Sequence, residues 1–151
     1  MWINLTTADL NEYLAAPQVR ALQTKALADG QTDPTPNIIS EIAEQVRNVI
    51  AAAGYPLESS AGTFPEVLKP SVAALVIELA QTRIPGLSLT TEQRNQVAYA
   101  RTMLANITAQ KVAIEPPVVP DYSLNGQGTG SLMRVVTKGE RIDREGLRRL
   151  S

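Results

Sequence analysis

The sequence predicts an all-α protein, a small bundle of about four to five helices with a long extended C-terminal tail. Aromatic residues are 4% of the 151-residue chain and apolar residues are 44%, so Ala, Val, Ile and Leu must build the core. These side chains suit packed helices better than a β-sandwich. Apolar residues also recur at spacings of three and four in several segments, as they do on one face of a helix. Three prolines and three glycines between residues 113 and 131 exclude a regular helix there.

Two short helices are predicted at the start of the chain. In residues 5–14, LTTADLNEYL, Thr6 is placed to cap the first turn. Asp9 stands at the third helical position, where the positive end of the helix dipole favours an acid. The second helix, APQVRALQTKALADG over residues 16–30, restarts at Pro17 and ends at a glycine.

The clearest helical pattern lies in residues 37–54, NIISEIAEQVRNVIAAAG. Glu41, Glu44 and Arg47 lie opposite the apolar face, and Gly54 supplies the left-handed stop that ends many helices. The apolar face consists of Ile39, Ile42, Val46, Val49 and Ile50.

Two further helices are predicted in the second half of the chain. The first of these helices is predicted within residues 66–84, EVLKPSVAALVIELAQTRI, with a new start at Pro70. This helix is apolar nearly all round, so we expect it to be the central one, buried on several sides. Residues 85–110 form the last long helix, in which Thr90 and Gln93 match a capping box. Its expected core residues are Val97, Leu104 and Ile107.

Three parts are predicted along the chain: a helical domain over residues 1–112, a Pro/Gly-rich linker over 113–131, and a docking tail over 132–151.

The distribution of charge also divides the chain into two regions. Residues 134–151 hold six Lys or Arg and three acidic residues, a net charge of +3. The other residues hold eight basic and twelve acidic residues, a net charge of −4. The total of −1 therefore conceals two regions of opposite sign.

The residue types present argue against catalysis. The chain has no Cys and no His, which removes thiolate chemistry, the commonest general base and the commonest metal ligand. Glu41 and Glu44 share a helix face, but no further ligand accompanies them, and we interpret them as solvated charges. The GQGTGS run lacks the Lys-Ser/Thr ending of a phosphate-binding loop. We therefore expect no catalytic, cofactor-binding or metal-binding residues, and no enzyme activity.

The sequence also lacks the patterns that direct a chain into a membrane. The start, MWINLTTADL, has neither the basic nor the apolar region of a signal peptide. No apolar run approaches the ~18 residues of a membrane helix. We expect a protein that is made and assembled in the cytosol.

The tail alternates apolar and basic residues, which is typical of a peptide that docks into a protein groove or adds to a sheet edge. The alternative is a small helical DNA-binding or regulatory protein with a basic C-terminal arm, because Arg pairs with phosphate as well as with carboxylate. The tail has acidic residues among the basic ones and no aromatic residue for base stacking, which favours docking on protein. A passive end is the third interpretation. The predicted partner-binding residues are Leu132, Met133, Arg134, Val135, Val136, Arg141, Ile142, Arg144, Leu147, Arg148, Arg149 and Leu150.

Four segments in a fixed order carry a resemblance to a known family: TTADL, AAAGYPL, FPEVLKPSVAALVIELAQTRI and TEQRNQVAYARTMLANITAQKVAI. Over about residues 5–114 this order resembles the head–tail connector proteins (adaptor or head-completion proteins) of Mu-like tailed bacteriophages and prophages. The long C-terminal tail is not part of the shared pattern. The matching positions are Thr7, Asp9, Leu10, Tyr55, Pro56, Leu57, Arg101, Leu104, Ile107, Lys111 and Val112.

The resemblance implies a structural role in the neck of a virion. Proteins of this family form a ring, commonly of twelve copies, between the portal protein of the capsid and the stopper or tail-completion protein. They use terminal segments to grip the portal or a neighbouring subunit. The implied partners are therefore the portal, the stopper and other copies of the same chain, with non-specific contact with packaged DNA and no membrane. The implied location is the virion neck, and the host cytoplasm during assembly.

Overall fold

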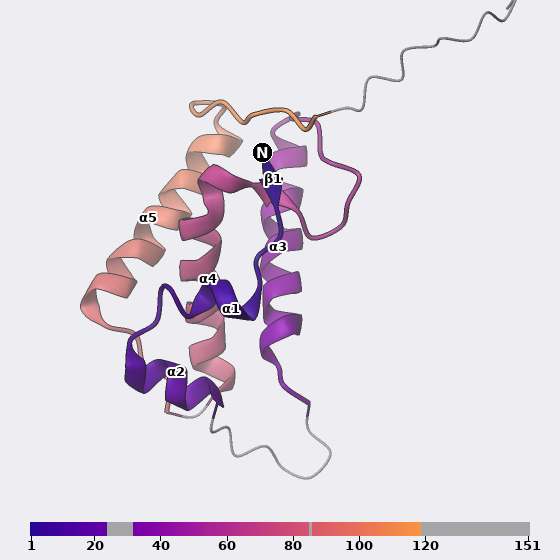
Figure 1. The fold of residues 1–151 in the computed structure, drawn as a ribbon. Coiled ribbons are helices and arrows are strands. Elements are labelled where there is room, and N and C mark those ends of the chain that lie inside the picture. Colours follow the sequence, from indigo (N-terminus) through magenta and orange to yellow (C-terminus); the bar gives the residue numbers. More distant parts are fainter. Residues whose placement is uncertain (24–31, 85, 119–151) are drawn as a thin grey trace, which may run out of the picture. The chain divides into compact units, whose positions relative to one another are not determined.

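The computed structural model describes residues 1–23, 32–84 and 86–118, which belong to one compact unit (Figure 1). This part of the chain is mostly helical, with one short two-stranded sheet, so the prediction of an all-α bundle is confirmed for it. The elements are β1 (Trp2–Ile3), α1 (Thr7–Leu10), α2 (Ala16–Gln23), α3 (Thr35–Ala52), β2 (Phe64–Pro65), the 3-10 turn η1 (Glu66–Leu68), α4 (Lys69–Arg83) and α5 (Thr91–Thr108).

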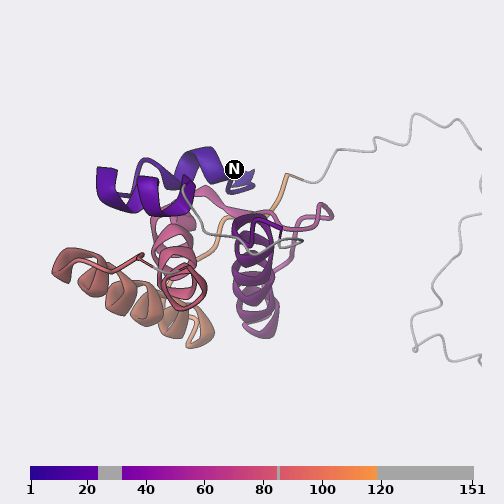
Figure 2. The ribbon, with the colours of Figure 1, turned by 90° about the horizontal axis from the view of Figure 1, so that it is seen from below.

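Helix α4 lies at the centre of the bundle, as its sequence predicts. It packs against both α3 and α5, and Figure 2 shows α1 and α2 on another side of it. Since no face of α4 is polar, burial on several sides removes the most apolar surface from water. Its buried residues are Ser71, Val72, Ala73, Ala74, Val76, Ile77 and Ala80.

Two capping boxes start helices where the sequence predicts them. In α1, the Thr6 side chain accepts a hydrogen bond from the Asp9 amide, and the Asp9 carboxylate accepts one from the Thr6 amide. Thr90 and Gln93 make the same reciprocal pair at the start of α5. Helix α1 is one turn long, so the helix expected over residues 5–14 is confirmed only at its start.

The end of α3 is closed by a glycine and by the segment that follows α5. Gly54 has a φ of +87°, a conformation that glycine adopts without strain, so the predicted helix stop is confirmed. The Gln110 side-chain amide donates to the carbonyl oxygen of Ala53 at 2.8 Å. The Tyr55 hydroxyl donates to the carbonyl oxygen of Val112 at 3.0 Å. These contacts join the C-terminal ends of α3 and α5.

A small sheet that the sequence does not predict brings three distant segments together (Figure 1). Strands β1 and β2 pair antiparallel, with Trp2 opposite Pro65. The Trp2 indole nitrogen donates to the carbonyl oxygen of Glu115 at 3.1 Å, and Ile114 is buried in the core. The packed unit therefore continues past residue 112. Strands of two residues are too short to show the alternation by which a strand is recognised.

The Asp9 carboxylate makes stability depend on acid pH. Hydrogen bonds from the Thr6 side chain, above all, and from Lys69 lower the pKa of Asp9 to about 2 from its usual 3.8. A carboxylate with a lowered folded-state pKa stabilises the fold above its unfolded pKa and loses that effect as the pH falls through both values. The Lys69 ammonium lies 2.9 Å from the carboxylate, whose side chain is 25% exposed, so solvent screens the pair in part.

We therefore expect Asp9→Asn to lower the free energy of unfolding by about 1 kcal/mol at pH 7. Because both proteins carry a neutral side chain at strongly acidic pH, the difference should shrink steadily from about pH 4 towards pH 2. Urea denaturation of the two proteins at several pH values measures it. A difference that stays constant over this range would contradict the assignment.

Candidate interaction surface

A groove of about 490 Å³ lies between α3 and α5, with α4 as its floor. Leu75 and Leu79 form the floor, and Ile42 of α3 and Leu104 of α5 stand on the two walls. Leu75, Leu79 and Leu104 are partly buried, so each keeps apolar surface open to the groove. None of the residues that line the groove belongs to α1 or α2.

Two ion pairs stand on the rim of this groove. An Arg83 guanidinium nitrogen lies 2.9 Å from a Glu41 carboxylate oxygen, which joins α4 to α3. Arg101 donates to both carboxylate oxygens of Glu78 at 2.8 Å, which joins α5 to α4. Such partly exposed pairs contribute little to stability, so an incoming charged group can rearrange them at low cost. An apolar floor with charges on its rim fits an apolar peptide that carries charged residues.

The groove exists because α4 has more apolar surface than its neighbours cover. Leu75 and Leu79 are four positions apart, so they lie one turn apart on the same face of the helix. In the sequence, Leu75 and Leu79 share one helix face with Val72 and Val76, at spacings of three and four, which predicts that all four belong to the core. The structure buries these two valines and leaves the two leucines only partly buried. Periodicity places a residue on an apolar face, but which part of that face a neighbour covers depends on tertiary packing.

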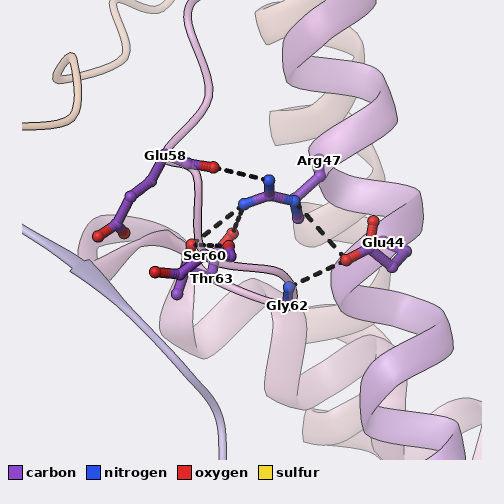
Figure 3. A network of polar contacts seen from close by, with 6 residues as sticks. All are labelled: Glu44, Arg47, Glu58, Ser60, Gly62 and Thr63. Atoms are coloured by element: carbon purple, nitrogen blue, oxygen red, sulfur yellow. Dashed lines mark hydrogen bonds and ion pairs between the residues drawn. The ribbon is translucent and has the colours of Figure 1, made fainter.

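Arg47 is buried beneath the loop that connects α3 to β2 (Figure 3). Its guanidinium donates to the carbonyl oxygens of Thr63 and Glu58, each at 2.8 Å, and to the Thr63 hydroxyl at 3.1 Å. The Glu44 carboxylate lies 3.7 Å from the Arg47 Nε atom and accepts a hydrogen bond from the Gly62 amide. The side chain therefore satisfies carbonyl groups of the loop that would otherwise be unpaired.

The interpretation of Glu41, Glu44 and Arg47 as one polar helix face needs correction at Arg47. Arg47 lies on the expected side of α3, but the residue is buried, with 8% exposed, because the loop after α3 folds over it. The burial of Arg47 could not be predicted from neighbouring residues, since its hydrogen-bond partners lie 11 and 16 positions further along the chain. Glu41 and Glu44 each contact a different arginine and do not face a common ligand. In the ranges 1–23, 32–84 and 86–118, no three acidic side chains are grouped as metal ligands would be.

The partner-binding residues that the sequence predicts all lie outside the described residues, between positions 132 and 151. The groove is therefore a surface that the sequence did not predict, and the predicted tail remains a prediction. No helix within the described ranges combines the length and apolar character that crossing a membrane requires.

The fold and the groove define a small all-α module with an apolar, charge-rimmed groove. No protein-family model, curated protein or solved structure matches the chain.

Replacing Arg47 with alanine should lower the free energy of unfolding by about 2–4 kcal/mol, because buried carbonyl groups lose their donor. Urea denaturation measures this loss, and limited proteolysis should show earlier cleavage within residues 55–63. Arg94→Ala, at an exposed position of α5, is the matched control and should change stability by less than about 0.5 kcal/mol. Equal stability of the two variants would contradict the anchoring role of Arg47.

Proposed function

We propose that this protein is a structural subunit of a phage neck, which forms an oligomeric ring between the portal of the capsid and the stopper or tail. The contact that best supports the proposal is the hydrogen bond from the Tyr55 hydroxyl to the Val112 carbonyl, at 3.0 Å. It joins two of the segments that carry the resemblance to head–tail connector proteins. Their spacing thus has a structural reason in this chain, as expected of a shared fold.

A third segment of the resemblance is also fixed by specific contacts. Asp9 of the TTADL start completes the capping box of α1 and pairs with Lys69 of α4 at 2.9 Å. Arg101, in the last segment, pairs with Glu78 of α4. The positions that resemble the family therefore tie other elements to the central helix, which supports a common architecture.

The surface suits an assembly part better than an enzyme. The described residues present an apolar groove and paired charges, and the whole chain lacks the His and Cys of most catalytic sites. An apolar groove of this kind recognises a peptide or a helix of a partner. The groove and the paired charges therefore fit a protein that acts by binding other subunits, without a cofactor or metal.

The tail over residues 132–151 supplies the second contact surface in this proposal. Its apolar and basic residues dock on the portal or on a neighbouring subunit. A peptide segment loses conformational entropy when it binds, so a single docking event adds little affinity. Repetition around a ring raises the total strength, because every further tail binds at a high effective concentration.

Deleting residues 132–151 should leave the helical unit folded and abolish its attachment to portal-bearing heads. Circular dichroism measures the first outcome, and electron microscopy of heads from the same phage, mixed with either protein, measures the second. A chain of full length in which residues 132–151 are replaced by Gly and Ser controls for length. Infectious particles assembled with the truncated protein would contradict the docking role.

The DNA-binding alternative makes a different prediction for the same pair of proteins. The full chain should then bind duplex DNA near 50 mM salt and lose affinity steeply at higher salt, while the truncated chain should not bind. A gel-shift titration separates the two functions, since docking on protein requires no such binding.

A further inference from the structure

We propose that the groove between α3 and α5 of one copy receives residues 132–136 of a neighbouring copy, Leu-Met-Arg-Val-Val. The inference rests on the proposed ring of copies and identifies which of its two docking partners the tail uses. It assigns a receptor site to a surface of the folded unit and an occupant to that site. The site is built from Leu75, Leu79, Ile42 and Leu104.

The size and shape of the groove fit a peptide. Its volume of about 490 Å³ falls within the range of roughly 300–1,000 Å³ that is typical of binding sites. The groove is bounded by two helices and floored by a third, an arrangement that accepts a segment with apolar side chains at regular intervals. Filling it would remove from water the apolar surface that the partly buried leucines of α4 leave exposed, which favours binding.

The segment matches the groove in chemistry. Residues 132–136 contain four apolar side chains around a single cation, Arg134. The groove presents apolar side chains along its floor, and the carboxylates of Glu41 on α3 and Glu78 on α4 are among the residues that line it. An arginine that enters between them can pair with a carboxylate in bidentate fashion while its apolar neighbours face the leucines. The net charges are also opposite in sign and therefore attract, because residues 134–151 carry +3 and the rest of the chain carries −4.

The chain between the folded unit and this segment is long enough to reach another copy. Val118, the last described residue, is 85% exposed, and residues 119–131 separate it from the docking segment. At about 3.3 Å per residue these thirteen residues span up to ~43 Å. Helix α3, with 18 residues at 1.5 Å each, is about 27 Å long. Thirteen residues can therefore span more than the length of α3, which is enough chain to reach a neighbouring copy.

A neighbouring copy is the occupant that uses every site in a closed ring. Each copy offers one groove and one tail, so contacts from tail to groove run in one direction around the ring and fill all grooves when it closes. Before assembly, the carboxylates at the groove have arginine partners within their own copy. Glu41 is paired with Arg83, and Glu78 with Arg101, until a third arginine arrives.

Cysteine cross-linking tests the contact directly, because the chain has no cysteine of its own. A full-length protein that carries Leu79→Cys is mixed with one that carries Val135→Cys, with and without portal-bearing heads, and oxidised. We expect a disulfide-linked dimer of the two on a non-reducing gel. A chain with both substitutions should give a ladder of linked copies. A fast-migrating monomer with an internal disulfide, or no cross-link under either condition, would overturn the proposal.

A matched control places the cysteine on the same bundle but away from the groove. Tyr99 of α5 is 61% exposed and does not line the groove, so Tyr99→Cys mixed with Val135→Cys should form little dimer. Arg134→Glu, added to the Val135→Cys chain, should lower the yield of the Leu79→Cys dimer about tenfold, because the rim carboxylates then repel the segment. Equal yields at positions 79 and 99 would mean random collision and would overturn the assignment.

The result also separates this inference from the proposed function. If no cross-link forms but deletion of the tail still prevents attachment to heads, the tail docks on the portal and the groove assignment is wrong. If the ladder forms but the protein does not bind portal-bearing heads, the contact between copies stands and the connector role fails.

Discussion

The rest of the bundle depends on the need to cover α4, a helix without a polar face. Packing holds its neighbours in place, and ion pairs at the edges of the contacts join α4 to three different helices. Lys69 pairs with Asp9 of α1, Arg83 with Glu41 of α3, and Glu78 with Arg101 of α5. Apolar burial supplies the driving force, and the partly exposed ion pairs add little to it. The groove marks one part of α4 that these neighbours leave uncovered.

A second set of contacts closes the unit at the end where its loops meet. The first strand, the loop before β2 and the segment after α5 are held there by hydrogen bonds between residues far apart in the chain. Arg47 has the same role inside the bundle, since one guanidinium satisfies two loop carbonyls. Hydrogen bonds from polar side chains thus hold the loops in place, as apolar packing holds the helices. They are needed because a buried backbone group without a hydrogen-bond partner destabilises the folded state.

These two features together suggest how such a module serves in an assembly. In the proposed assembly the groove of the bundle is the receptor, and the tail of opposite net charge is the ligand that every copy carries. Neither part requires catalytic chemistry. In a ring, weak contacts of this kind are multiplied by the number of copies, so modest complementarity at each groove suffices.

Local chemistry made much of the fold predictable from the sequence. The two capping boxes, the stop at Gly54 and the central place of an apolar helix all follow from residues that are neighbours in the chain. The burial of Arg47, the pairing of Trp2 with Pro65 and the incomplete burial of the leucines in the groove could not be predicted in this way. They depend on partners up to 113 positions apart, as with Trp2 and Glu115, and no local pattern records such partners. Sequence periodicity shows which side of a helix is apolar, but which neighbour covers that side is settled when the helices pack.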